Sequence, residues 1–394
     1  MNKDSFCVLP HMHQMVRQDG TVSLCCSAID LGLQKDHPVK AWQSDYMKDV
    51  RAKLANGTKI SQCQLCWDRE AKGFRSMRQE SNELYPNITK TLQTPKYLDL
   101  RLSNLCNLKC RMCNPVYSSQ IAKEYVDINQ TWYDEFVTGE EREFKQVPLQ
   151  EVKPDMWEQL KSYISGLEKI YFTGGEPTLV PQVKEYLQEC IDTGHSEHIE
   201  LVFTTNLTNI NQPLLSMCDQ FKQVHWAMSI DGYGELNNYI RSNSNWKTID
   251  KNLKRLLSSK FSAGIHPTVC VYNVLYITDL LEYVEELWDG RFMPFIFLNL
   301  LQTPDFLSFQ YLPDSIKHVA SKRLQKYLIR SKYSQKDKQH YDVIVNIINL
   351  LKNSTYDPSK LIKMKRFNDT LDITRNTQLQ TVAPEIYECI QNLY

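Results

Sequence analysis

Short runs of β-branched and aromatic residues alternate with longer helical stretches in the middle of the chain. The runs are YLDLRLS (97–103), KIYFTG (169–174), IELVFTT (199–205), VHWAMSID (224–231), HPTVCVYN (266–273) and FIFLNLL (295–301). The stretches between them, such as PQVKEYLQECIDTG, have apolar residues at helical spacing and end in glycine, as helices often do. These strand-then-helix units predict an α/β fold with a parallel sheet and right-handed crossovers. Six strands are too few for a closed eight-stranded barrel and suit an open, partial one.

The same pattern divides the chain into three parts. We expect a cysteine-rich module over residues 1–90, the strand-and-helix series over 91–312 and a helical extension over 313–394. The segment 123–168 interrupts the series with tryptophan, tyrosine and many glutamates. Long insertions inside compact domains are often functional. A substrate lid and a peripheral helical insertion are both open interpretations of this segment.

Charge and hydropathy exclude several classes of protein. The 394 residues include 46 Lys+Arg and 46 Asp+Glu, so the formal net charge is +0. A neutral chain lacks the positive excess that phosphate backbones attract, which weighs against a large nucleic-acid partner. The first residues, MNKDSFCVLPHMH, lack the apolar run of a secretory signal. The best apolar runs are far shorter than the ~20 residues that span a bilayer. We therefore expect a cytoplasmic protein without a membrane partner, whose thiols stay reduced.

In a reducing compartment, cysteines are expected to serve as metal ligands rather than to form disulfides. Eight of the 12 cysteines fall within the first 113 residues: Cys7, Cys25, Cys26, Cys63, Cys66, Cys106, Cys110 and Cys113. A free cysteine in a helix or strand behaves as a small hydrophobe. We expect such buried positions for the four that stand alone: Cys190, Cys218, Cys270 and Cys389.

A cysteine triplet follows the first predicted strand. The stretch SNLCNLKCRMCNP places Cys106, Cys110 and Cys113 in the spacing C-x3-C-x2-C. Three thiolates can hold three corners of a cubane iron–sulfur cluster and leave the fourth iron open to a small molecule. Structural zinc takes four ligands, and catalytic zinc sites usually include a histidine, which this loop lacks. The triplet also lies at the C-terminal end of a strand, where such folds place their chemistry.

These residues resemble the radical S-adenosylmethionine (SAM) superfamily, over roughly residues 97–302. The resemblance implies a partial (β/α)6 barrel and a [4Fe-4S] cluster on the cysteine triplet, whose open iron binds SAM. It also implies that the reduced cluster cleaves SAM and that a 5′-deoxyadenosyl radical abstracts hydrogen from a substrate. An external one-electron reductant such as flavodoxin or ferredoxin is then a partner.

Polar residues at the strand ends fit the same resemblance. The second strand ends in Thr173, Gly174, Gly175, Glu176 and Pro177, which resemble the GGEP motif that holds the SAM amino group. Paired glycines permit a close backbone approach, and Glu176 offers a carboxylate to an ammonium.

Further SAM contacts are expected at the later strands. Ser229 and Asp231 suit ribose hydroxyls, and Arg241 suits the SAM carboxylate. Turn capping and a surface ion pair are the alternative roles for this set. Met112 stands where the family often has an aromatic residue, so adenine packing is expected to involve neighbours such as Leu298. The other candidates at the mouth of the sheet are Thr204, Thr205, Asn206, Asn273 and Asn299.

A second cysteine set lies near the N-terminus. Cys7 and Cys25 flank Gly20 in the pattern C-x12-G-x4-C, and Cys63 and Cys66 form a later CxxC. A turn near Gly20 and a single helix predicted over residues 41–57 can bring the two pairs together to ligate a second cluster. The arrangement resembles the SPASM and twitch modules that hold auxiliary clusters, although those usually follow the barrel. The count here suits one auxiliary [4Fe-4S] cluster.

Alternatives for this second set stay open. A four-cysteine zinc knot has the same spacing, because spacing alone does not separate zinc from iron. Cys26 is an alternative to Cys25. His11 and His13 lie close to Cys7, and we expect them to be supporting or exposed residues rather than ligands.

The combined features predict a radical SAM enzyme that acts on an unactivated C–H bond. Relatives with auxiliary modules often modify ribosomally made peptides, which suggests a peptide substrate. Nucleotide or RNA-base modification is a second hypothesis, in which the aromatic insertion stacks a base. A non-catalytic iron–sulfur carrier or zinc-stabilised scaffold is a third, and the GGEP motif disfavours it.

The two cysteine sets together predict the metal content. After anaerobic reconstitution we expect about eight irons per chain, four for each cluster. Iron and zinc analysis of the desalted protein measures this. A content of about four irons together with bound zinc would contradict the auxiliary cluster.

Overall fold

The computed structural model describes residues 4–28, 35, 37–71, 75–137, 149, 151–287 and 295–393. The chain divides into two compact units. Unit 1 comprises Met1–Cys106, Val147–Thr204 and Ile210–His225. Unit 2 comprises Asn107–Gln146, Thr205–Asn209 and Trp226–Tyr394. The three-part division expected from the sequence stays a prediction.

The strands of unit 1 run in the order β6-β5-β3-β1-β2. Their bounds are β1 (His13–Val16), β2 (Val22–Ser23), β3 (Tyr97–Leu100), β5 (Lys169–Phe172) and β6 (Glu200–Thr205). The β1–β3, β3–β5 and β5–β6 pairs are parallel, and β2 pairs antiparallel with β1. Buried and half-buried residues alternate along β6, which places Leu201 and Phe203 in the core. Three of these strands match predicted runs.

Strand β1 was not among the predicted strands. Its sequence HQMV carries two polar side chains, yet all four residues are buried. Each polar side chain has one backbone partner: Gln14 Nε2 donates to the Pro38 carbonyl at 2.9 Å, and His13 Nδ1 lies 3.2 Å from the Leu24 carbonyl. Through the pairing of His13 with Tyr97, the N-terminal segment extends the parallel sheet.

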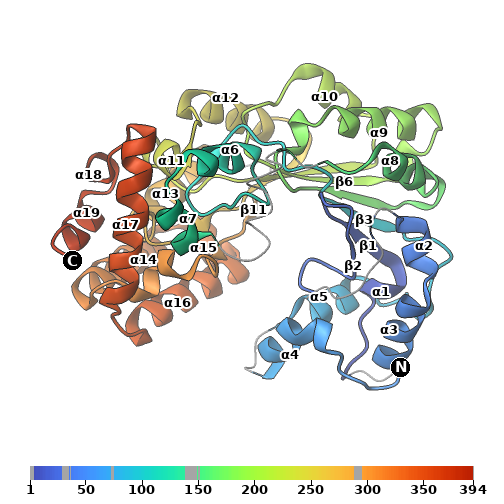
Figure 1. Cartoon of the computed structure of the whole chain (residues 1–394), viewed down its shortest axis with the longest axis horizontal. Helices are drawn as coiled ribbons and strands as arrows, with labels where there is room; N and C mark the ends of the chain where they lie inside the picture. The colour runs from blue at the N-terminus through green and yellow to red at the C-terminus, as the bar shows by residue number, and fades with distance from the viewer. Residues whose placement is uncertain are drawn as a thin grey trace. The chain divides into compact units, whose positions relative to one another are not determined.

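The described helices of unit 1 include α9 (Pro181–Asp192), which matches the predicted stretch PQVKEYLQECIDTG. They are α1 (Leu9–Met12), α2 (Pro38–Gln43), α3 (Asp45–Ala55), α4 (Gln64–Ala71), α5 (Met77–Leu84), α8 (Pro154–Lys161), α9 (Pro181–Asp192) and α10 (Gln212–Cys218) (Figure 1). The single helix expected between Ala41 and Gly57 is two, because the Ser44 hydroxyl accepts from the Met47 N–H and begins α3. Gly57 follows with a φ of 98°, a conformation that glycine adopts without strain.

The strands of unit 2 form three groups. β7 (Gln223–Met228), which begins in unit 1, β9 (Ser262–Ile265) and β11 (Phe295–Ile296) run in the order β11-β9-β7. β10 (Thr268–Val269) pairs with β12 (Asn299–Leu300), and β4 (Lys109–Cys110) pairs with β8 (Arg241–Ser242). The parallel pairs in both units confirm the α/β class, and the described strands form no closed barrel.

The last two predicted strands are interrupted. The run 266–273 contains only β10, and β9 lies just before it. Pro267 separates the two because proline has no N–H to donate to a ladder. The run 295–301 likewise divides into β11 and β12.

Unit 2 is otherwise helical in its described part. Its helices are α6 (Ser119–Asp127), α7 (Gln130–Phe136), α11 (Glu235–Ile240), α12 (Trp246–Leu257), α13 (Ile277–Leu287), α14 (Asp314–Arg330), α15 (Lys332–Lys336), α16 (Lys338–Asn353), α17 (Pro358–Arg375), α18 (Leu379–Val382) and α19 (Pro384–Ile390). The C-terminal extension is helical as expected, with α14 packed on α16 (Figure 1). Among the described residues no helix is both long and apolar enough to cross a membrane.

The 123–168 insertion includes α7 and α8, while residues 138–148 and 150 lie outside the described residues. Trp132 of α7 is buried and stacks on Phe367 at 5.6 Å between ring centroids. Phe136 packs on the same Phe367 and on Phe306. This tryptophan therefore belongs to the core of unit 2 and is not presented for stacking on a base.

Candidate functional site

The GGEP stretch contacts the backbone immediately before Cys106, within unit 1. The Gly175 N–H donates to the Ser103 carbonyl at 3.1 Å, and the Glu176 N–H donates to the Leu105 carbonyl at 2.7 Å. A Cβ atom on Gly175 would lie 2.3 Å from the Leu105 oxygen, which no side chain permits. The close approach expected of the paired glycines is therefore made to the chain's own cysteine loop.

Glu176 is buried at the end of this stretch. Its Oε1 accepts from the Thr178 hydroxyl at 2.7 Å and begins the short helix Pro177–Leu179. Gly174 has a φ of 111°, which suits glycine alone. The contact of Glu176 with an amino group stays a prediction, and this geometry gives its carboxylate a fixed position.

In unit 2, Cys110 lies directly opposite Arg241. The two residues are partners in the antiparallel β4–β8 pair, and Arg241 Nη1 lies 3.8 Å from Cys110 Sγ. Burial raises the pKa of the Cys110 thiol, and the Arg241 guanidinium acts in the opposite direction. A neighbouring cation favours the thiolate, which is the form that binds iron.

Asp231 holds Arg241 in this position. Arg241 Nε donates to Asp231 Oδ2 at 2.5 Å, and the Thr268 N–H donates to Asp231 Oδ1 at 2.7 Å. Asn273 Nδ2 donates to the Asp231 carbonyl at 2.8 Å. Burial lowers the pKa of the Arg241 guanidinium, but Asp231 and Cys110 outweigh it and the pKa is raised.

The Asp231–Arg241 ion pair is buried, whereas the alternative role considered for these residues was an ion pair on the surface. The Asp231 side chain is fully buried and that of Arg241 is 13% exposed. Both Asp231 carboxylate oxygens already accept hydrogen bonds from the protein, so Asp231 orients Arg241. Its contact with ribose hydroxyls stays a prediction.

The end of β6 is tied to the residue after Cys106, again within unit 2. Asn206 Nδ2 donates to Asn107 Oδ1 at 3.0 Å, and Asn107 Nδ2 donates to Thr208 Oγ1 at 2.9 Å. The Thr205 hydroxyl accepts from the N–H of Leu207, whose φ is 64°. Sequence reasoning missed Asn107 and Thr208, although an asparagine beside a ligand cysteine is a signal that could have been read.

The remaining candidates near the strand ends vary in exposure. Ser229 donates its N–H to the Thr205 carbonyl at 2.8 Å. Leu298 is buried, whereas Met112 and Asn299 are half-buried. Their roles at a SAM site stay predictions.

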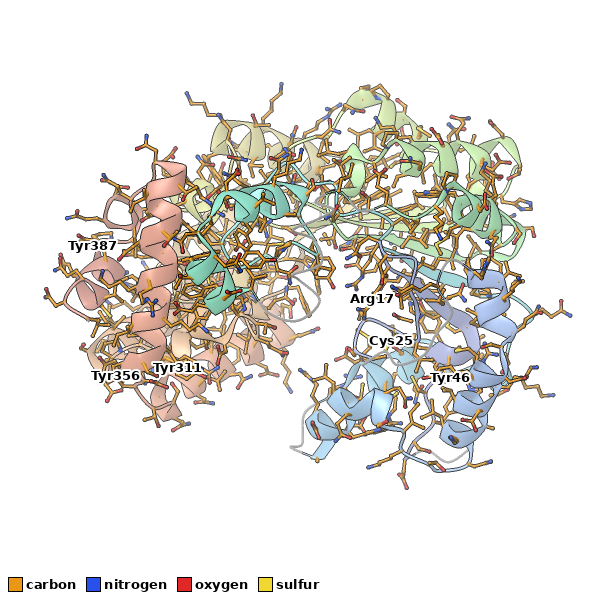
Figure 2. The ribbon with its side chains drawn as sticks, viewed as in Figure 1. Arg17, Cys25, Tyr46, Tyr311, Tyr356 and Tyr387 are labelled. Carbon is orange, nitrogen blue, oxygen red and sulfur yellow. The ribbon has the colours of Figure 1, made fainter. Side chains whose placement is uncertain are left out.

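The N-terminal cysteines belong to a hydrophobic core within unit 1. Cys7 and Cys25 pack with apolar residues of α1 and α3, and Cys63 and Tyr46 pack against this cluster. Figure 2 labels Cys25 and Tyr46 there. Burial and, to a smaller extent, the charges of Cys63 and Cys66 raise the pKa of Cys7 to about 12. The four thiols are thus near enough to influence one another.

Arg78 is a neighbour of this set that sequence reasoning missed. It forms an ion pair with Glu70 at 2.7 Å, donates to the Phe6 carbonyl at 2.8 Å and lies over Trp67. Its charge lowers the pKa of Cys7 against the effect of burial. A buried cation beside several thiols suits thiolates that ligate a metal.

The other residues near this set are placed as follows. Cys26 is exposed. His11 Nδ1 lies 2.9 Å from the Thr91 hydroxyl, and burial lowers the pKa of His11 to about 4. Cys190, Cys218 and Cys270 are buried as expected, and Cys389 is half-buried.

Both cysteine sets fit iron–sulfur ligation by their donor chemistry, since all their thiols are free. No group of three or more His, Cys, Asp or Glu side chains in the described residues is already arranged as a metal-ion site. Ligation by Cys106, Cys110 and Cys113, and by Cys7, Cys25, Cys63 and Cys66, therefore stays a prediction.

Comparison with known proteins identifies relatives of the strand-and-helix series. The model of the radical SAM superfamily matches residues 100–287. An uncharacterized protein of Methanocaldococcus jannaschii is 26% identical over 197 residues, which cover 48% of this chain and 58% of that protein.

Two solved structures resemble the chain at low identity. Native anSMEcpe with bound AdoMet is 17% identical, with a TM-score of 0.42 over 59% of this chain and 60% of that one. SuiB of Streptococcus suis bound to S-adenosylmethionine is 14% identical, with a TM-score of 0.40 over 76% and 62%. The chain thus spans less than two thirds of the length of each relative.

The buried Asp231–Arg241 pair makes a prediction about stability. Asp231→Asn leaves the guanidinium without its countercharge and is expected to lower the free energy of unfolding by about 3–5 kcal/mol. Asp369→Asn, in the exposed Lys365–Asp369 pair of α17, is the matched control and is expected to cost less than about 1 kcal/mol. Urea denaturation followed by circular dichroism measures both. Equal losses in the two variants would show that Asp231 does not carry this role.

Proposed function

We propose that residues 100–287, which the model of the radical SAM superfamily matches, form a domain with which the chain cleaves SAM reductively. The products are methionine and a 5′-deoxyadenosyl radical that abstracts hydrogen from a substrate. The observation that carries the proposal is the position of Arg241 opposite Cys110 inside the matched segment. A thiol and a fixed cation meet there, as a site that binds the carboxylate of an amino acid beside an iron–sulfur cluster requires.

Each part of the site has a proposed task. Cys106, Cys110 and Cys113 hold the [4Fe-4S] cluster, which supplies the electron when it is bound and reduced. Arg241, oriented by Asp231, pairs with the SAM carboxylate.

The GGEP stretch of unit 1 has a proposed task of its own. Gly174 and Gly175 let its backbone lie against residues 103–105, and the fixed carboxylate of Glu176 is proposed to bind the SAM amino group. The other proposed SAM contacts are Met112, Pro177, Thr205, Asn206, Ser229 and Leu298.

We also propose that Cys7, Cys25, Cys63 and Cys66 hold an auxiliary [4Fe-4S] cluster and that the substrate is a peptide or protein. Support for the cluster comes from the shared burial of these thiols and from Arg78 beside them. Support for a peptide comes from the twitch-like cysteine spacing. The neutral chain and the buried Trp132 weigh against an RNA substrate. A one-electron reductant is required, and reduced thiols favour a cytoplasmic location.

SAM cleavage tests the central proposal. Reconstituted and reduced wild-type protein is expected to convert SAM to 5′-deoxyadenosine, and Cys110→Ala is expected to abolish the product because the cluster loses a ligand. Cys389→Ala, a half-buried cysteine outside both sets, is the matched control and is expected to retain the activity. Chromatography with mass detection measures the product. Absence of product from reduced, iron-loaded wild type would overturn the proposal.

A separate variant tests the auxiliary cluster. Cys63→Ala is expected to remove about four irons per chain while 5′-deoxyadenosine still forms, because the second cluster has a separate ligand set. Cys26→Ala, an exposed neighbour, is expected to keep about eight irons. Full iron content in Cys63→Ala contradicts the ligand assignment, and loss of all SAM cleavage in that variant contradicts the division of tasks.

A further inference from the structure

The two residues that flank Cys110 are bound to the C-terminal end of α17, all within unit 2. On the first side, Arg375 Nη1 donates to the Lys109 carbonyl at 2.8 Å. The same guanidinium binds Glu124 at 2.6 Å, and Lys109 Nζ binds that carboxylate at 2.7 Å. The side chains of Arg375 and Glu124 are 2% and 4% exposed. One carboxylate therefore joins the cysteine loop, α6 and α17.

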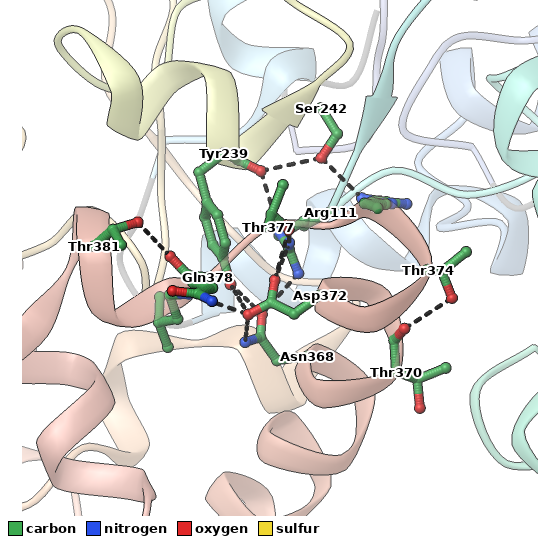
Figure 3. A network of polar contacts seen from close by, with 12 residues as sticks. Arg111, Tyr239, Ser242, Asn368, Thr370, Asp372, Thr374, Thr377, Gln378 and Thr381 are labelled. Carbon is green, nitrogen blue, oxygen red and sulfur yellow. Dashed lines mark hydrogen bonds and ion pairs between the residues drawn. The ribbon is translucent and has the colours of Figure 1, made fainter.

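On the second side, Arg111 is completely enclosed. Its Nη1 donates to Asn368 at 2.8 Å, and its Nη2 donates to Thr377 at 2.8 Å and forms an ion pair with Asp372. Figure 3 shows these contacts at the end of α17. Its Nε donates to the Tyr239 carbonyl, and its guanidinium lies 3.8 Å from the centre of the Tyr239 ring. The side chain has no exposed surface.

These contacts constrain the loop in a way that ordinary packing does not. Arginine presents its donors in a rigid planar fork, so each bidentate contact fixes direction as well as distance. Burying a charge is costly unless its partners are in place, so the loop conformation that meets all partners is strongly favoured. A third restraint lies next to the β4–β8 pair, where the Arg111 N–H donates to the Ile240 carbonyl at 2.8 Å.

The charge around this loop is unbalanced. Lys109 and Arg375 share the single carboxylate of Glu124, which leaves one positive charge beside Cys110. Net charge and hydrogen bonds near the sulfurs are among the factors that set the reduction potential of an iron–sulfur cluster. A positive charge favours the reduced form.

We propose that Arg111 and Arg375 are positioning residues through which α17 fixes the Lys109–Met112 backbone and raises the reduction potential of the cluster that Cys110 ligates. This inference rests on the proposed function. It gives the C-terminal extension a task in the radical chemistry without contact with SAM or substrate.

The test uses the full-length, reconstituted protein and separates the effect of the Arg375 charge from the effect of its hydrogen-bonding geometry. Arg375→Gln removes both, and is expected to lower the midpoint potential in a titration followed by electron paramagnetic resonance. It is also expected to lower kcat for 5′-deoxyadenosine formation about tenfold to a hundredfold, because small displacements at reacting centres are costly. Arg375→Lys keeps the positive charge, so the midpoint potential of the cluster is expected near the wild-type value. Its kcat is expected to lie between those of wild type and Arg375→Gln. Lys365→Ala, in the exposed pair on the same helix, is expected to match wild type in both.

A measurement without the cluster keeps the two proposals separate. In the full-length protein before reconstitution, amide hydrogen exchange of residues 109–113 is expected to be faster in Arg375→Gln and in Asp372→Asn than in Lys365→Ala. Unchanged exchange and an unchanged potential in Arg375→Gln overturn the inference while wild type still cleaves SAM. Absence of SAM cleavage in wild type overturns the proposed function, and faster exchange in the variants would then still show that α17 holds the loop.

Discussion

The pairing of buried guanidiniums with buried carboxylates organises the centre of unit 2. Arg241 with Asp231, Arg111 with Asp372 and Arg375 with Glu124 all surround the two-residue strand that contains Cys110. Each pair is costly to bury unless its geometry is met. The surrounding elements are therefore constrained: the turn after β7 and β8 must be in place for Asp231 to meet Arg241, and α6, the cysteine loop and the end of α17 for the other two pairs.

The strands of the series could be predicted because short β-branched and aromatic runs that alternate with helical stretches are typical of strands in a βα fold. The exceptions have local causes. β1 carries the polar residues His13 and Gln14, which do not indicate a buried strand in the sequence; backbone carbonyls of Leu24 and Pro38 contact them in the fold. Pro267 breaks the fifth run, since a proline removes one donor from the ladder.

The site could be predicted only at the residues that carry a recognisable motif. The cysteine spacing and the GGEP motif indicate iron–sulfur ligation and SAM binding directly. The positive φ of Gly174 and the close backbone approach at Gly175 explain why both positions are glycine. Arg111 has no such signal, because its side-chain partners Asn368, Asp372 and Thr377 are distant in sequence. The partner of Arg111, Asp372, is 261 residues away, and no local pattern records that pairing.

That separation also bears on biosynthesis. Contacts between residues so far apart form late, since the chain must close a very long loop before the contact can contribute. Arg111 leaves the ribosome long before Asp372 and Arg375 do, so the cysteine loop is made first and acquires its final partners last. The fixed conformation of the loop therefore requires that α17 has been synthesised, and a chain that lacks Asp372 and Arg375 leaves Cys110 and Cys113 with fewer restraints.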